Sequence, residues 1–198
     1  MRLKESQPAG ACDPDTEARQ IALARSGDLE AFDCLVRRHF ARIYALLFRM
    51  IGNHEDAEDL AQECFIKAHK SLDRFQGKAA FSTWLYRIAL HLSRDQYRRR
   101  QSAPQIALGF EGSELVSKAQ GPQEQTSRKE LMDGMRNSLE RLPHRLRAAL
   151  ILRTQEGMEY EEIASVLGIG VQTARVHVMK ARRQLEQWLR EWCGEEQS

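Results

Sequence analysis

The sequence lacks any apolar run long enough to cross a lipid bilayer. Its longest apolar stretches, residues 43–51 and 148–152, are short, and Arg49 interrupts the first of them. A spanning helix needs roughly 20 mostly apolar residues, so no membrane insertion is expected. The N-terminus carries Glu5 and Asp13 and has no apolar core of the kind found in secretory signal peptides. We therefore expect a protein that stays in the cytoplasm.

Cysteines are few and widely spaced. They are Cys12, Cys34, Cys64 and Cys193, with no C-x-x-C pair and no adjacent histidine at ligand spacing. This spacing favours neither a zinc site nor a disulfide framework. We expect reduced thiols, as is usual inside cells.

Motifs for catalysis are missing as well. The sequence has no clustered set of acids for metal ions and no Walker-type Gly-rich loop with Lys, and neither Ser82 nor Tyr97 sits in a recognisable catalytic context. We therefore predict no catalytic residues, no metal site and no cofactor, and we expect that the protein is not an enzyme.

The net charge is small: 30 Lys and Arg residues against 28 Asp and Glu residues leave +2. Such a charge does not by itself predict nucleic-acid binding, because affinity for phosphate depends on where the cations cluster. Cations do cluster at the end of the first half of the chain, at Arg94, Arg98, Arg99 and Arg100.

Helical periodicity dominates the first half. Residues 1–17 contain Pro, Gly and polar residues and are predicted to be a flexible tail. Apolar residues then recur at helical spacing through residues 18–100, which are predicted to form one compact helical domain. Asp28 is a predicted N-cap, and Gly52 with Asn53 is a predicted helix break.

A change of composition separates the two halves. Residues 101–127 are rich in Gln, Ser, Gly and Pro and are predicted to be a flexible linker. Helical patterning returns in residues 128–193, and residues 194–198 are a predicted tail. The predicted fold class is therefore all-α, with two small helical domains joined by a flexible linker.

The second domain contains a helix-turn-helix pattern. A short helix begins near Glu159, with its acids at the positive end of the helix dipole, and Gly168 provides a sharp turn. A longer helix follows from about Val171. The N-terminal outward side of such a second helix enters the DNA major groove. Cations on it could also be a solvated surface, but the tight helix pair in front of them favours DNA binding.

Two segments resemble the extracytoplasmic-function group of the bacterial sigma-70 family. Residues 56–90, DAEDLAQECFIKAHKSLDRFQGKAAFSTWLYRIAL, are similar to its second conserved region, and residues 142–185 are similar to its fourth. The resemblance implies an RNA polymerase sigma factor that directs promoter recognition, melting and transcription initiation. Its first domain would bind the polymerase clamp and open the minus-10 element, and its second would read the minus-35 element.

The resemblance also implies site residues. Without the resemblance, we would interpret Asp59, Gln62 and Glu63 only as a polar helix face. Trp84, which recurs with apolar residues at helical spacing, would be placed in the core. Phe75 with residues 76–80 corresponds to the loop that captures a flipped base. The implied polymerase-binding residues are Asp56, Asp59, Gln62 and Glu63. The implied minus-10 residues are Phe75, Lys78, Trp84, Tyr86, Arg87, His91, Arg94 and Arg98. The implied minus-35 residues are Gln172, Thr173, Arg175, Val176, Met179, Lys180, Arg182 and Arg183.

Some positions depart from the family pattern. His91 stands where many members carry Asn, and Val176, His177 and Lys180 replace Ser, Arg and Arg in the recognition helix. Arg and Lys are not equivalent in bidentate reading of guanine, so the family's base preferences do not carry over.

The implied partners are core RNA polymerase, through its beta-prime clamp and beta flap, promoter DNA, and an anti-sigma factor that could hold the protein at the inner membrane.

One alternative function is that of a free-standing helix-turn-helix activator, because the TARVH stretch, residues 173–177, also resembles response-regulator recognition helices. A DNA-acting enzyme such as a recombinase is another. An activator of that type predicts alternating strands and helices in residues 18–100, whereas this half reads as helical throughout.

Overall fold

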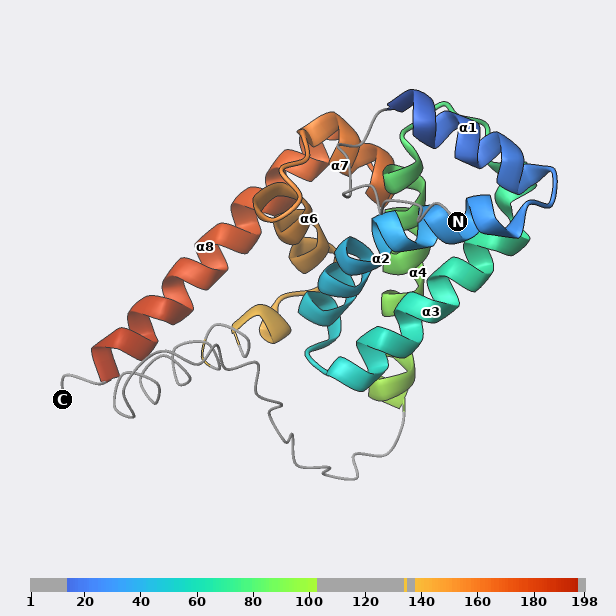
Figure 1. Ribbon diagram of the computed structural model, residues 1–198. Helices are drawn as coiled ribbons and strands as arrows, with labels where there is room; N and C mark the ends of the chain where they lie inside the picture. Colours follow the sequence, from blue (N-terminus) through green and yellow to red (C-terminus); the bar gives the residue numbers. More distant parts are fainter. Residues whose placement is uncertain (1–13, 103–133, 135–137, 196–198) are drawn as a thin grey trace, which may run out of the picture.

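A computed structural model of the chain describes residues 14–102, 134 and 138–195. These residues form helices and no strand, in two groups that lie side by side (Figure 1). The predicted all-α fold with two helical domains is confirmed. Most of the predicted linker, from residue 103 onward, lies outside the described residues.

The first group packs four α-helices and one short 3-10 helix. The elements are α1 (Pro14–Arg25), α2 (Leu29–Ile51), α3 (His54–Lys70), η1 (Leu72–Arg74) and α4 (Phe81–Ser102). Fully buried side chains from α2 and α4, among them Leu35, Ile43 and Leu85, form the centre of its core. Burying one such side chain contributes about 1.5–3 kcal/mol.

Local sequence features set the helix boundaries in this domain. The Asp28 carboxylate accepts a hydrogen bond from the Ala31 backbone N–H at 3.1 Å and caps α2. Gly52 ends the same helix with φ of 79°, a left-handed conformation that glycine adopts without strain. Asn53 caps α3 by accepting from the Asp56 N–H at 3.0 Å. The predicted cap and the predicted break are thus confirmed.

Two helices extend beyond their expected limits. Helix α1 begins at Pro14, within the segment expected to be a tail, and the Glu17 carboxylate lies 2.7 Å from Nε2 of buried His39. Helix α4 continues through the arginine cluster to Ser102. The guanidinium of Arg100 reaches back to the Asp56 carboxylate, which ties the last turns of α4 to the start of α3.

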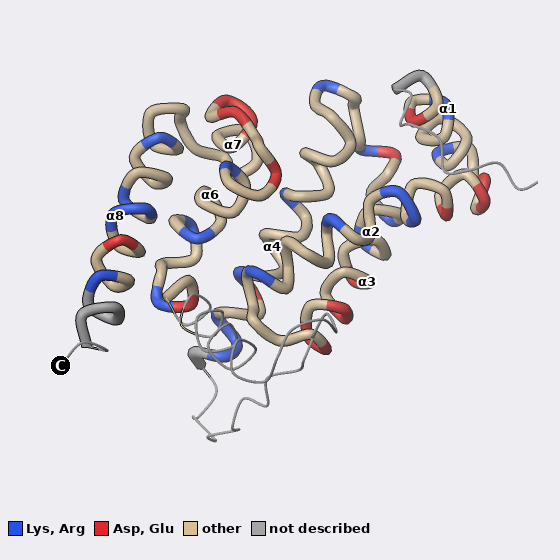
Figure 2. The backbone as a smooth tube through the Cα atoms, turned by 60° about the vertical axis from the view of Figure 1, so that its left-hand side comes forward, with Lys and Arg blue, Asp and Glu red and all other residues tan. Residues whose placement is uncertain are grey.

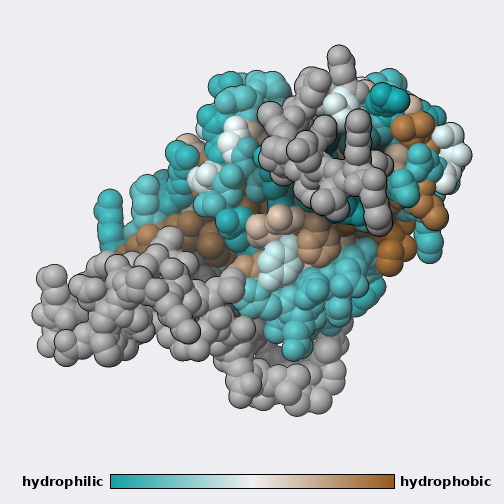
Figure 3. Space-filling model, in the orientation of Figure 1, coloured by the Kyte–Doolittle hydropathy of each residue, from teal (hydrophilic) through white to brown (hydrophobic). Residues whose placement is uncertain are grey.

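The second group contains α6 (His144–Thr154), α7 (Tyr160–Leu167) and α8 (Val171–Glu195), and residues 138–141 before them are also helical. Its core contains Leu142, Leu152, Ile163 and Val178, each at most 1% exposed. Helix α8 runs far past the core as a long rod (Figure 1). In the space-filling view, hydrophilic side chains cover α3 and much of α8, and apolar side chains are exposed in a narrow band between them (Figure 3).

A buried arginine joins the two domains. Arg147 is 3% exposed, and its Nη1 donates to the Met50 carbonyl oxygen at 2.6 Å, at the C-terminal end of α2. Its Nη2 donates to the carbonyl oxygens of Glu140 and Leu142. Burial lowers the pKa of Arg147, yet a guanidinium remains charged in proteins. The domains therefore pack on each other, which the sequence did not predict.

Within the part of the chain that the structure describes, no helix is both long and apolar enough to span a membrane.

Replacing Arg147 by Met tests this contact. Methionine keeps much of the side-chain length but leaves three carbonyl oxygens without their donor, so we expect the free energy of unfolding in urea to fall by about 1–3 kcal/mol. Arg145→Met, at an exposed position of the same helix, is the control and should have little effect. An equal effect of the two substitutions would show that Arg147 does not stabilise the fold through these carbonyl groups.

His144 makes the stability of this junction depend on pH. Its Nε2 lies 2.9 Å from Oγ of Ser93 in α4. Burial, with Arg147, Arg94 and Arg145 nearby, lowers its pKa from 6.5 to about 4, and the Tyr97 ring also faces it at 6.2 Å. Between pH 6.5 and 4 the unfolded chain therefore binds a proton that the folded chain does not, so the free energy of unfolding falls as pH falls.

The variant His144→Gln has no titrating group at this position. Urea denaturation at several pH values should therefore give a shallower pH dependence for the variant than for the wild type in this window. Parallel curves for the two proteins would show that His144 is not buried as a neutral group.

Candidate nucleic-acid interface

Helices α7 and α8 form the predicted helix-turn-helix. Glu159 caps α7 in a reciprocal capping box, with the Glu162 carboxylate accepting from the Glu159 N–H at 2.9 Å. Gly168 ends α7 with φ of 64° and reverses the chain. Ala164 and Ala174, which are 5% and 0% exposed, let the two helices approach closely. The predicted motif is present where the sequence placed it.

The outward side of α8 carries the side chains proposed for minus-35 DNA. All eight are exposed, and Lys and Arg recur along the helix, whereas Asp and Glu gather at the start of α7 (Figure 2). Met179 and Val176 are 61% and 39% exposed, so two apolar side chains are accessible on this face among the polar ones. These residues are Gln172, Thr173, Arg175, Val176, Met179, Lys180, Arg182 and Arg183.

The guanidinium of Arg175 lies over the aromatic ring of Tyr160. The Arg175 Cζ atom lies 5.2 Å from the Tyr160 ring centroid, and Cζ of Arg153 lies 4.9 Å from the same centroid. Arg153 in turn pairs with Glu159 at 3.0 Å. Tyr160 and Arg175 line a shallow hollow of about 440 Å³ together with Arg182 and Arg183. Sequence reasoning missed Tyr160, because a tyrosine at the start of a helix has no distinctive pattern.

His177, one of the departures in the recognition helix, does not point freely into solvent. It is half-buried, its Nδ1 atom is buried without a hydrogen-bond partner, and burial lowers its pKa. Arg145 and Lys180 lower this pKa further. The side chain is therefore part of the packing of α8 rather than of its exposed stripe.

The polar stripe on α3 is exposed along most of its length. Asp59 and Gln62 are exposed, and Glu63 forms an ion pair with Lys67 at 2.9 Å. Asp56 differs from these residues, because the Arg100 guanidinium and the Gln96 amide both donate to its carboxylate. Three of the four proposed polymerase-binding residues are thus accessible, and Asp56 also holds α3 against α4.

The start of α4 carries an aromatic cluster. Phe75 and Trp84 lie 5.3 Å apart between ring centroids, and Phe81 lies within 5.5 Å of both rings. Trp84 is half-buried, so it contributes to the core while keeping one edge accessible. Lys78 in the preceding loop is exposed.

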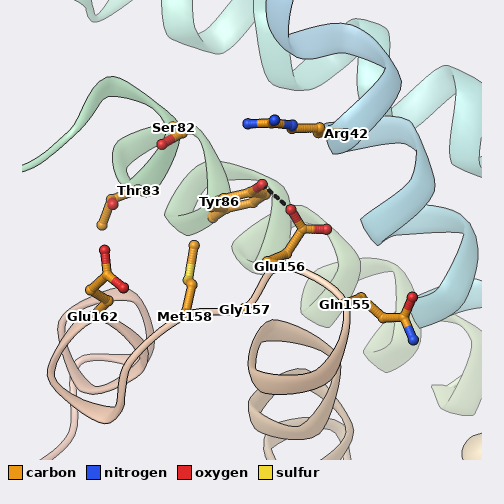
Figure 4. A pocket seen from close by; sticks show the side chains of 9 residues that line it. All are labelled: Arg42, Ser82, Thr83, Tyr86, Gln155, Glu156, Gly157, Met158 and Glu162. Carbon is orange, nitrogen blue, oxygen red and sulfur yellow. Dashed lines mark hydrogen bonds between the residues drawn. The ribbon is translucent and has the colours of Figure 1, made fainter. Parts of the chain in front are cut away.

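The second domain contacts the middle of α4, where Tyr86 is buried and Arg87 stays exposed. Tyr86 is 3% exposed, and its hydroxyl donates to the Glu156 carboxylate across a polar pocket of about 260 Å³ (Figure 4). Burial and this carboxylate raise the pKa of Tyr86. Arg87 donates from Nε to the Ser165 carbonyl oxygen at 3.0 Å and from Nη2 to the Ser165 hydroxyl at 2.6 Å.

The last proposed minus-10 residues lie further along α4. His91 and Arg98 are exposed, and Arg94 is half-buried. Nη2 of Arg94 lies 2.8 Å from Nδ1 of His91, and Asp95 lies 3.4 Å from the other ring nitrogen. The eight proposed minus-10 residues therefore follow one path along the loop and α4, but Tyr86 and Arg87 are engaged by the second domain.

No cluster of metal-ligating side chains occurs among the described residues. Of the four cysteines, Cys34 is exposed and Cys64 is buried, and burial raises the pKa of the Cys64 thiol to about 12. That thiol is therefore protonated and poorly reactive at neutral pH.

Comparison with known families matches both halves of the chain. Residues 35–103 match the model of Sigma-70 region 2, and residues 133–185 match that of Sigma-70, region 4.

Curated relatives are similar over most of their length. The RNA polymerase sigma-H factor of Pseudomonas aeruginosa is 34% identical over 182 residues, which is 88% of this chain and 94% of the relative. The ECF RNA polymerase sigma factor SigW of Bacillus subtilis is 32% identical, over 87% of this chain and 96% of SigW.

Solved structures agree in fold. CnrH, in complex with the cytosolic domain of CnrY, superposes with a TM-score of 0.67 at 29% identity, covering 89% of this chain and 99% of CnrH. The sigma factor RpoE of Bartonella quintana, in complex with the anti-sigma factor NepR, gives a TM-score of 0.64 at 24% identity, covering 82% of this chain and 98% of RpoE.

Since both sigma regions occur in order and the relatives match nearly end to end, this chain belongs to the extracytoplasmic-function group of the sigma-70 family of RNA polymerase sigma factors.

Proposed function

We propose that this chain binds core RNA polymerase through the exposed stripe of α3 and reads the minus-35 element with α8. The observation that carries the proposal is the exposed cationic face of α8, directly after the short helix α7, in a chain that also exposes Asp59 and Gln62 on α3. Polymerase would supply the chemistry of RNA synthesis, because sigma factors as a family are not enzymes.

The loop before α4 and the outer face of α4 are the proposed minus-10 surface. A base that leaves the stack loses a few kcal/mol, and an aromatic or pocketed site recovers part of that cost. The accessible edge of Trp84 beside Phe75 suits such a base, and Lys78 and Arg98 suit the phosphates that flank it. Melting then requires binding energy only and no covalent step.

The two DNA-binding surfaces would act together on one polymerase. Each alone offers modest affinity, but tethering both raises the effective concentration of the second site once the first is bound. The distance between the minus-10 and minus-35 elements thereby becomes part of promoter recognition. The beta-prime clamp is the proposed partner of α3, and the beta flap that of the second domain.

An anti-sigma factor is the proposed regulator. This follows the family and the fold shared with a sigma factor solved with the anti-sigma factor NepR. We propose that the chain works in the cytoplasm, where core polymerase is found, and that an inhibitor could hold it at the inner membrane. The activator alternative predicts strands in residues 18–100, and the described residues of this half form none.

Start-site mapping tests the proposal. Purified core polymerase with this protein, on a library of bacterial promoter fragments, should initiate at sites that share two spaced elements. The variant Gln62→Ala/Glu63→Ala should weaken core binding by about 1–3 kcal/mol and lose these starts, while keeping the wild-type affinity for double-stranded DNA. Glu30→Ala, at an exposed position of α2, removes the same net charge and should behave as wild type.

Two results would contradict this assignment. DNA binding without initiation by the core enzyme would favour an activator. Unchanged polymerase binding by the double variant would mean that α3 does not contact the clamp.

The variant Arg175→Ala tests whether α8 recognises the base sequence of the minus-35 element. If its guanidinium, held by Tyr160, contacts a base edge, Arg175→Ala should lower affinity for the preferred promoter by roughly 1–3 kcal/mol and affect scrambled DNA little. Arg190→Ala, at an exposed position near the far end of α8, is the control. Fluorescence anisotropy on both DNAs provides the measurement, and an equal loss on the two DNAs would make Arg175 a phosphate contact.

A further inference from the structure

Two arginine side chains from different helices meet at one aromatic ring. The Cζ atoms of Arg153 in α6 and Arg175 in α8 lie 4.9 and 5.2 Å from the centroid of the Tyr160 ring. Both distances are within the roughly 6 Å over which the face of a ring attracts a guanidinium. Tyr160 thus joins one cation from the helix before the helix-turn-helix to one from its second helix.

The two arginines use their N–H donors differently. Nη1 of Arg153 donates to the Met158 carbonyl oxygen at 2.7 Å and lies 3.0 Å from the Glu159 carboxylate. Arg175 makes no hydrogen bond and no ion pair with any residue that the structure describes. A guanidinium carries five N–H donors, so Arg153 is fixed partly by donors that it has used, whereas Arg175 keeps its own available.

The Tyr160 ring has a fixed place in the fold. Tyr160 is the first residue of α7, directly after the Glu159 cap, and its side chain is half-buried against the core. Helix α7 packs on α8, which carries Arg175 at an exposed position. The ring therefore belongs to the framework of the helix-turn-helix, and the guanidinium belongs to its surface.

An aromatic ring can orient a guanidinium without occupying its donors, which a carboxylate cannot do. A carboxylate beside Arg175 would accept the parallel N–H groups that bidentate recognition of guanine requires. The Tyr160 ring leaves these groups open while it restricts the side chain. An arginine that is already oriented loses less rotamer freedom on binding, and its fixed donors discriminate better between base edges.

We propose that Tyr160 is a positioning residue for sequence reading: its ring, and not its hydroxyl, holds the Arg175 guanidinium in the orientation that hydrogen-bonds a base edge. The inference rests on the proposed function, which assigns Arg175 to minus-35 DNA. Arg153, which is tied to Met158 and Glu159, helps to place the ring and reads no base.

The test separates the ring from the hydroxyl. Tyr160→Phe keeps the ring and removes the hydroxyl, whereas Tyr160→Leu removes the ring and keeps an apolar side chain. Both substitutions are made in the full-length wild type and in full-length Arg175→Ala. The probes are a duplex that the wild type selects from a random-sequence pool and a scrambled duplex of the same composition. Fluorescence anisotropy gives the ratio of the two affinities, and circular dichroism gives the helix content.

We expect Tyr160→Leu to lower this ratio about three- to tenfold, through weaker binding of the selected duplex alone. Tyr160→Phe should keep the wild-type ratio, because it retains the ring. In the Arg175→Ala background, Tyr160→Leu should cause no further loss, because the ring acts through Arg175. A merely structural role of the ring would lower affinity whether or not Arg175 is present.

Several results would overturn the proposal. A wild-type ratio for Tyr160→Leu would show that the ring does not support sequence reading. Equal losses for the Leu and Phe variants would assign the effect to the hydroxyl, as a direct DNA contact. An equal loss on both duplexes, or a loss that persists in the Arg175→Ala background, would show that Tyr160 does not act through Arg175. If Tyr160→Leu loses helix content, Tyr160→Met takes its place, and the same results overturn the proposal.

The transcription assay separates this proposal from the sigma function. If core polymerase initiates with the wild type but Tyr160→Leu keeps the wild-type ratio, the positioning role fails and the sigma function stands. If the core enzyme does not initiate, while Tyr160→Leu loses the ratio only when Arg175 is present, the sigma function fails and the positioning role stands.

Discussion

The arrangement of this molecule depends on one buried cation. Arg147 lies in the middle of α6, and at 3% exposure its guanidinium is shielded from water, so its donors depend on acceptors within the protein. Its Nε atom has no hydrogen-bond partner among the described residues, but its two Nη atoms do. The acceptors are the carbonyl oxygens of Met50, Glu140 and Leu142. Met50 is at the end of α2, where helix carbonyls have no intrahelical partner. The Arg147 guanidinium thus gains an acceptor, and a free carbonyl at the end of α2 gains a donor. This shared hydrogen bond fixes α6 against the first domain.

From that placement the other contacts follow. With α6 docked beneath the end of α2, the turn after α6 brings Glu156 to Tyr86, and α7 brings Ser165 to Arg87. The covered surface is therefore the middle of α4, while the α3 stripe and the recognition helix face solvent (Figures 1 and 2).

What could be predicted from the sequence was local. Asp28, Gly52 and Gly168 mark helix ends by chemistry that acts within a few residues, and the helix-turn-helix is itself a local motif. The junction between domains could not be predicted in this way. Arg87 and Ser165 are separated by 78 positions, and neither has a periodic pattern that would indicate its partner. Arg147 directly precedes the apolar stretch 148–152, but a cation beside an apolar stretch does not show which carbonyl groups surround it.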